Sequence, residues 1–125
     1  MSKYNETEFI KLDSFYTKDI IYGWIHGTGG VLFRQKLSRW ANIMGVHFNR
    51  ACVKDLSSRW GSCSSNKNLN FCWKIFLLPE SLADYIMVHE LAHLRYLNHS
   101  QKFWDMVSTY ISDYKQRRNE LKKYI

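Results

Sequence analysis

The sequence is poor in residues that interrupt or cross-link a chain. Its 125 residues include one proline, six glycines and three cysteines. Cys52, Cys63 and Cys72 are odd in number and lack the C-x-x-C spacing of many metal and redox motifs, so a disulfide framework is not expected. We interpret them as reduced thiols, which are typical of a cytoplasmic protein.

Long apolar runs are also absent. The first residues, MSKYNETEF, contain no apolar stretch of signal-peptide length, and no later run is long and uncharged enough to span a bilayer. We therefore expect a cytoplasmic protein without a membrane partner. Because no repeat or low-complexity tract occurs, residues 1–125 are expected to form a single domain, with 1–15 as a disordered or extended lead-in.

Acidic residues are few compared with basic ones. The chain has 18 Lys and Arg against 11 Asp and Glu, a net charge of +7, and the segment 115–125 supplies +4 of it through five basic residues and one acidic residue. Such a block is more often a solvated helix face than a binding site. Nucleic acid therefore stays open as a partner, but the solvated face is the favoured interpretation. The apolar content of 46% is typical of a folded core.

The spacing of apolar residues predicts an α+β fold. Helical intervals on both sides of the glycine cluster 27–30 predict two N-terminal helices, or one broken helix, that end at Gly45 as a C-terminal cap. Between Val46 and Leu78 the apolar residues recur at every second position around turn residues. This alternation predicts a small antiparallel sheet of about three strands.

Two further helices are expected after the sheet. Pro79 fits the first turn of a helix that runs to about Leu97, because its missing N–H costs nothing there. Ser100 is a suitable N-cap for a C-terminal helix, which the basic tail is expected to extend.

A metal-binding motif lies on the first of these two helices. Residues 89–93 read His-Glu-Leu-Ala-His. Positions i and i+4 share a helix face, so His89 and His93 are expected to bind one metal ion from a rigid support. Glu90 points about a quarter-turn away, which suits a general base that reaches a water on the metal.

A third ligand is expected after the helix. A catalytic zinc usually takes three protein ligands and leaves a fourth position for water. His99 follows His93 at a spacing that allows the helix to end and the chain to turn back toward the same ion. Glu120, Asp105 and Asp113 stay open as alternatives for this position.

Other motifs accompany this one in a fixed order. They are Arg59-Trp60-Gly61-Ser62-Cys63-Ser64-Ser65, Leu77-Leu78-Pro79-Glu80, His89-Glu90-Leu91-Ala92-His93-Leu94, and Asn98-His99-Ser100 with Phe103-Trp104. Together they resemble the YgjP-like metallopeptidase domain and, more distantly, the SprT-like and WLM zinc peptidases. The resemblance covers roughly residues 46–125. It implies a minimal zincin-like domain with zinc as the metal and a third His ligand.

The segment from Arg59 to Ser65 has two interpretations. In the functional one it forms a sheet edge that pairs with an extended peptide, with Trp60 walling the site and Cys63 near the metal. In the structural one Gly61 allows a close approach, Trp60 packs and Arg59 makes an ion pair. The residues alone do not choose between them.

The predicted function is zinc-dependent hydrolysis of peptide bonds in a peptide or protein substrate. In this hypothesis Zn²⁺ is held by His89, His93 and His99, lowers the pKa of its bound water and polarises the carbonyl. Glu90 takes the proton from that water and returns it to the leaving amine.

Two rival functions stay open. The same site and a basic surface would suit a nucleoside triphosphate pyrophosphohydrolase, although no Gly-rich phosphate loop is present. A nucleic-acid or protein-binding module would instead use a structural zinc, for which Cys63 is the candidate fourth ligand. If the chain is a peptidase, the oxyanion donor is open among Tyr96, Arg59 and a backbone N–H.

Overall fold

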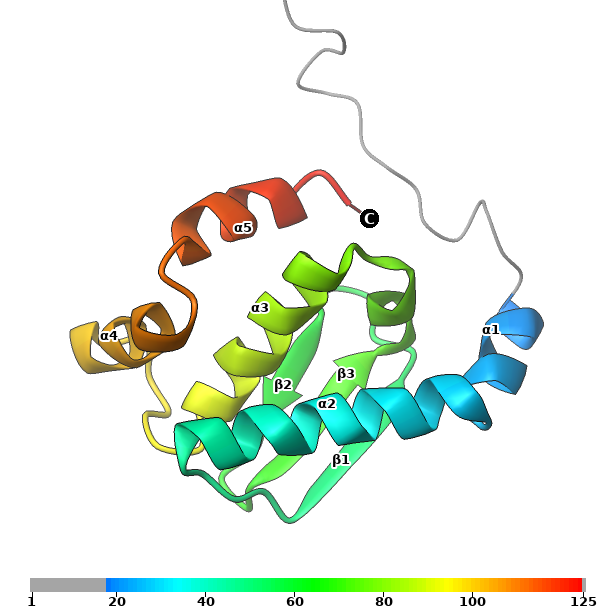
Figure 1. Cartoon of the computed structure of the whole chain (residues 1–125), viewed down its shortest axis with the longest axis horizontal. Helices are drawn as coiled ribbons and strands as arrows, with labels where there is room; N and C mark the ends of the chain where they lie inside the picture. The colour runs from blue at the N-terminus through cyan, green and yellow to red at the C-terminus, as the bar shows by residue number, and fades with distance from the viewer. Residues whose placement is uncertain (1–17, 125) are drawn as a thin grey trace, which may run out of the picture.

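The computed structural model describes residues 18–124, in which a small sheet lies behind two of the helices (Figure 1). In chain order the elements are α1 (Lys18–Ile25), α2 (Thr28–Met44), β1 (Arg50–Lys54), β2 (Gly61–Cys63), β3 (Asn68–Cys72), the 3-10 helix η2 (Trp73–Leu77), α3 (Glu80–Ala92), α4 (Gln101–Tyr110) and α5 (Tyr114–Leu121). The predicted α+β class is confirmed. The lead-in predicted at 1–15 lies outside the described residues, and the single domain stays a prediction.

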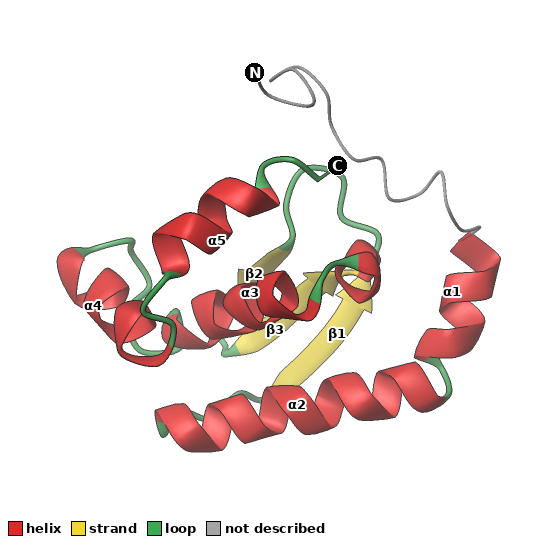
Figure 2. Cartoon of the chain, turned by 45° about the horizontal axis from the view of Figure 1, so that its top comes forward, coloured by secondary structure: helices red, strands yellow, loops and turns green. Residues whose placement is uncertain are grey.

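The two predicted N-terminal helices are present and meet at a corner (Figure 2). Phe33, Leu37, Ala41 and Met44 recur at intervals of three and four along α2, and all four are buried. They therefore form the one face of α2 that packs on the core. Gly45 ends this helix with a φ of 68°, and its N–H returns to carbonyls of the last turn, as predicted for a glycine cap.

The sheet has three strands in the order β1-β3-β2, but it is mixed rather than wholly antiparallel. β2 and β3 form the expected antiparallel hairpin, whereas β1 and β3 run parallel. The prediction was wrong here because alternating apolar residues indicate which face of a strand is buried and not its direction. Segment 55–60 carries the chain past the end of the sheet, so β3 returns between β1 and β2.

Helix α3 begins where predicted and ends earlier. Pro79 precedes it with an extended backbone, and Glu80 is its first residue. The helix stops at Ala92, not near Leu97, and three further residues form a turn. A helix continued to position 99 would carry that residue about 120° round from His93, so the early end is what lets residue 99 approach the same face.

The C-terminal part forms two helices, not one extended helix. Ser100 is the N-cap of α4, and its hydroxyl accepts a hydrogen bond from the N–H of Phe103 at 3.4 Å, as predicted. Ile111 then leaves the helical conformation while its side chain stays buried. This break redirects the chain, so that α5 returns beside α3 (Figure 1).

Helix α3 is central to the core and is clamped to its neighbours. The strands lie behind α2 and α3 in Figure 1, and the fully buried Leu69 and Phe71 of β3 pack in the same core as the apolar face of α3. On the outer side, the Lys36 ammonium lies 2.6 Å from the Glu80 carboxylate and 2.9 Å from that of Asp84. No helix among residues 18–124 has the length and apolar character needed to cross a membrane.

Candidate metal centre

The structure brings together the three histidines that the sequence singled out. His89 lies in the last turn of α3, His93 is the C-cap residue that follows Ala92, and His99 lies just before α4. The His99 Nε2 is 3.1 Å from the Nε2 of His93 and 3.2 Å from that of His89. Three nitrogens bound to one tetrahedral zinc at about 2.0–2.1 Å would stand about 3.3–3.4 Å apart. The spacing therefore fits a single ion.

The outer nitrogens of two of these rings have acceptor partners. The His93 Nδ1 is 2.9 Å from the carbonyl of Tyr96, and the His89 Nδ1 is 3.1 Å from Oε2 of Glu90. A carbonyl and a carboxylate accept hydrogen bonds, so each Nδ1 is the protonated nitrogen and each Nε2 keeps its lone pair. Lone pairs that converge in this way suit a bound cation, so the residues present fit a metal ion.

Aromatic side chains fix the planes of the imidazoles. Phe103, which is fully buried, stacks on His93 with ring centroids 4.3 Å apart. Trp104 stacks on His99 with ring centroids 5.7 Å apart, and it also stacks on Tyr114 of α5 with centroids 5.1 Å apart. Since neither Phe103 nor Trp104 can bind a metal, their part is to hold the rings in the ligating orientation.

Burial also keeps two of the imidazoles neutral. The pKa of His93 lies below its usual value, chiefly because burial disfavours the charged ring. Burial is also the main cause of the lowered pKa of His99, to which the neighbouring rings of His89 and His93 add. The neutral imidazole is the form that binds metal ions.

Glu90 is buried beside the cluster and faces β2. Its side chain is 7% exposed. A Cβ on Gly61 would lie 3.0 Å from the Glu90 Cγ and equally close to the carbonyl oxygen of Asn70. The sheet edge can therefore approach the carboxylate because residue 61 has no side chain, and the expected close approach at this glycine is confirmed.

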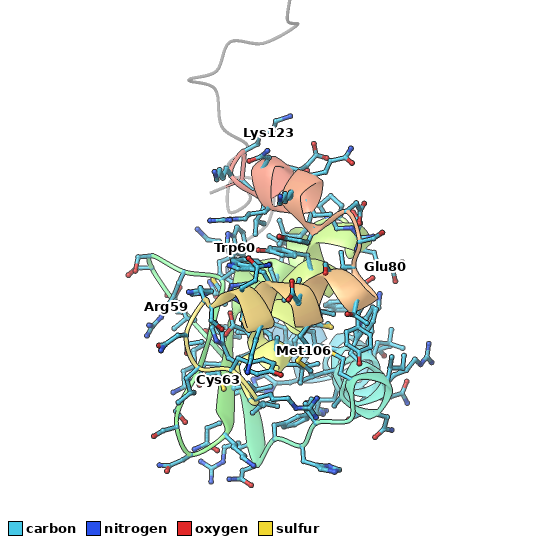
Figure 3. The ribbon with its side chains drawn as sticks, turned by 90° about the vertical axis from the view of Figure 1, so that its left-hand side faces the viewer. Arg59, Trp60, Cys63, Glu80, Met106 and Lys123 are labelled. Carbon is cyan, nitrogen blue, oxygen red and sulfur yellow. The ribbon has the colours of Figure 1, made fainter. Side chains whose placement is uncertain are left out.

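A cavity of about 330 Å³ opens beside His89 and Glu90. Its other lining residues come from the segment before and at the start of β2, from the first half of α3, and from α5 with the residues after it: Arg59, Trp60, Gly61, Tyr85, Ile86, Arg118, Leu121, Lys122 and Tyr124. Figure 3 shows Trp60 beneath α5. Burial raises the pKa of Tyr85 to about 12, so its phenol is a hydrogen-bond donor at neutral pH.

The alternative third ligands lie elsewhere. Among the described residues, the group with metal-ligand spacing contains His89, His93 and His99 alone. Asp105 accepts from Gln101, Asp113 pairs with Arg117, and Glu120 pairs with Lys123.

Cys63, the candidate fourth ligand, is not in this group either. Burial and, after it, the charge of Glu90 raise the pKa of the Cys63 thiol, which disfavours the thiolate that metals bind. All three cysteines are free thiols, as predicted.

Comparison with known families assigns the chain to a class. The family model described as YgjP-like, metallopeptidase domain, matches residues 9–124. The chain belongs to the YgjP-like metallopeptidase family. The match extends well to the N-terminal side of residue 46, where the resemblance seen in the sequence began. No protein of curated function matches this YgjP-like chain.

Two solved structures share the fold of this YgjP-like chain. The metallopeptidase zymogen of Pyrococcus abyssi abylysin has a TM-score of 0.66 and 22% identity over 71% of this chain and 90% of its own. The metallopeptidase zymogen of Methanocaldococcus jannaschii jannalysin has a TM-score of 0.58 and 18% identity over 70% of this chain and 94% of its own. At these identities the likeness concerns the fold.

Several residues of the cavity were not identified from the sequence. Tyr85 precedes His89 by one helical turn, so the i, i+4 rule could have placed it on the same face. The sequence places Arg118 and Lys122 in a basic block that is typical of a solvated helix face, and nothing in their spacing indicates that α5 returns beside α3. Of the two side chains that the sequence leaves open as oxyanion donors, Arg59 lines the cavity and Tyr96 does not.

Proposed function

We propose that the chain is a zinc metallopeptidase that hydrolyses peptide bonds, with His89, His93 and His99 as ligands and Glu90 as general base. The observation that supports this most is the convergence of three imidazole Nε2 atoms beside a buried carboxylate, at the edge of an open cavity. Three protein ligands leave one tetrahedral position vacant, as hydrolysis requires and as a structural zinc site does not.

The protein groups divide the remaining work. A zinc ion held by the three histidines supplies Lewis acidity toward water and the substrate carbonyl. Glu90 accepts the proton of the attacking water and later donates it to the leaving amine. Its hydrogen bond to the His89 Nδ1 keeps that ring in the metal-binding tautomer and orients the carboxylate.

The edge of the sheet offers a place for the substrate backbone. Among residues 18–124, β2 is an edge strand that pairs only with β3, and Gly61 brings it against Glu90. An extended peptide that adds to the free side of β2 would run beside the catalytic carboxylate. We propose this arrangement as the functional role of the segment from Arg59 to Ser65.

The first experiment compares the wild type with Glu90→Gln. Both proteins are loaded with zinc and incubated with an unstructured protein, with and without DNA, and separately with a nucleoside triphosphate. We expect the wild type to cleave the protein and Glu90→Gln to lose at least 100-fold in rate, because a positioned general base contributes about 10²–10⁴-fold. Metal analysis should give one zinc in each.

The outcomes separate the candidate functions. Release of pyrophosphate or phosphate by the wild type, without peptide cleavage, would support the pyrophosphohydrolase instead. Binding of zinc without any turnover by the wild type would support a binding module. Retained cleavage by Glu90→Gln, or its failure to bind zinc, would contradict the role of Glu90.

A further inference from the structure

Three basic side chains line the cavity beside His89 and Glu90. These are Arg59, Arg118 and Lys122, whereas Glu90 is the one carboxylate among the described residues that line it. Within residues 18–124 none of these three basic side chains is paired with a carboxylate. The cavity therefore presents unpaired positive charge within reach of the groups proposed to carry out hydrolysis.

Arg118 is held in place by the aromatic side chains that support the metal cluster. Its guanidinium carbon lies 5.1 Å from the ring centroid of Trp104, and the same ring stacks on both Tyr114 and His99. A guanidinium resting on an aromatic face keeps its N–H groups free to bind an anion in the ring plane. The contact thus orders Arg118 without using its hydrogen-bonding capacity.

The location of the cavity indicates which substrate residue enters it. His89 and Glu90 line the cavity, but His93 and His99 do not. In the proposed mechanism Glu90 donates its proton to the leaving amine, which belongs to the residue that follows the scissile bond. If the leaving amine lies at Glu90, the side chain of that residue would be the one closest to the cavity. The volume of about 330 Å³ lies in the usual range of ligand pockets.

We propose that this cavity selects substrates with a carboxylate on the residue that follows the scissile bond, and that Arg118 and Lys122 bind that carboxylate. The apolar and aromatic walls formed by Ile86, Trp60 and Tyr124 contact the carbon stem of the same residue. A glutamate side chain and the free α-carboxylate of a chain end share this chemistry. The inference rests on the proposed peptidase function and names its substrate class.

The test uses internally quenched peptides that differ only in the residue after the cleaved bond: Glu, Gln, Leu or Lys, all with amidated ends. We expect kcat/KM for the Glu peptide to exceed that for the Gln peptide at least tenfold in the wild type, as a charge-assisted hydrogen bond allows. Arg118→Gln should reduce this ratio to within about threefold, and Arg118→Glu should favour the Lys peptide. Lys122→Gln should reduce the ratio in part.

Lys115→Gln is the matched control. Lys115 lies on α5 and is exposed, but it does not line the cavity, so its loss removes the same charge from the same helix. The Glu to Gln ratio should not change in this variant. A further peptide ends one residue after the cleaved bond and has a free α-carboxylate. Comparing it with the amidated Glu peptide shows whether the cavity binds the carboxylate of a chain end or that of a side chain.

A binding measurement tests carboxylate selection by the cavity independently of peptide hydrolysis. The affinity of each peptide for zinc-loaded Glu90→Gln is read from tryptophan fluorescence, with ATP as a competitor. If the wild type cleaves nothing but this variant binds the Glu peptide at least tenfold more tightly than the Gln peptide, carboxylate selection stands and hydrolysis fails. Equal kcat/KM for the Glu and Gln peptides in the wild type would overturn the selection and leave the peptidase function intact. Binding of ATP without binding of the Glu peptide would also overturn it.

Discussion

At the scale of single residues, Gly61 controls how closely the sheet edge approaches the buried carboxylate. A side-chain carbon at this position would meet Glu90 and the backbone of Asn70 within 3.0 Å, and neither can move without disturbing the site or the sheet. Glu90 is the group whose position matters most for the proposed proton transfers. A change at Gly61 should therefore affect catalysis more than folding.

We predict that Gly61→Ala lowers kcat/KM at least tenfold, because a displacement of about 1 Å near the reacting groups can cost about 100-fold. The accompanying loss of stability should be about 1–3 kcal/mol, as for other overpacked sites. Peptide hydrolysis and thermal unfolding of the zinc-loaded protein measure the two effects.

Gly23→Ala provides the comparison for the same substitution. Gly23 lies inside α1, and a Cβ there would meet nothing within 4 Å. Alanine should raise the stability by up to about 1 kcal/mol through helix propensity and leave kcat/KM unchanged. If Gly61→Ala also left kcat/KM unchanged and did not lower the stability, the close approach of Gly61 to Glu90 would have no role in catalysis.

At the scale of elements, α2 and the start of α3 are joined by a polar clamp made of Lys36, Glu80, Asp84 and Trp40. The Trp40 indole N–H donates to the Asp84 carboxylate at 3.1 Å, and Lys36 contacts both acids. Burial works against the charge of Lys36, but hydrogen bonds to Glu80 and Asp84 raise its pKa above 10.5. The same hydrogen bond from Lys36 holds the pKa of Glu80 below 4.5.

The signs of these two shifts define a pH window for the clamp. The contribution of Glu80 is present above pH 4.5 and is lost as the pH falls through its lower folded-state pKa. The contribution of Lys36 is present below pH 10.5 and is lost as the pH rises through its higher folded-state pKa. We predict that Lys36→Met lowers Tm at pH 7 and that its difference from the wild type shrinks below pH 4.5. Lys102 of α4 makes no ion pair with any residue of 18–124, so Lys102→Met should show no such trend.

The elements also show what the sequence could predict. Helix α2, the Gly45 cap, the Pro79 start and the Ser100 cap follow from local preferences and were predicted correctly. Sheet direction and the break at Ile111 depend on contacts between distant segments, which local patterns do not encode. The histidine cluster was predictable because its ligands lie at the end of one helix and in the short segment after it. The basic cavity was not, because α5 reaches it from far along the chain.

At the scale of the whole molecule, the three histidines connect α3 to the segment that leads into α4. A metal bound there should stabilise the folded chain, since an unfolded chain does not hold the three rings together. At a free zinc concentration of about 100 Kd the gain is about 2.7 kcal/mol. For a protein of this size such a gain corresponds to a rise in Tm of roughly 10 °C.

We predict this rise for the wild type on addition of zinc, and its reversal by a chelator, in thermal unfolding experiments. Glu90→Gln should keep the rise, whereas His99→Ala should lose most of it. His47→Ala is the control, because His47 is exposed and lies outside the cluster. An undiminished rise in His99→Ala would exclude His99 as a ligand.

The open edge of β2 has a consequence for the behaviour of the protein at high concentration. An unpaired strand edge can also join the sheet of another copy and begin aggregation. β2 is only three residues long, and the opposite edge strand, β1, carries Arg50 and Lys54 at its ends. The short length of β2 limits pairing at one edge, and the like charges of β1 limit pairing at the other. The free backbone edge of β2 is therefore a poor template for polymerisation of the chain.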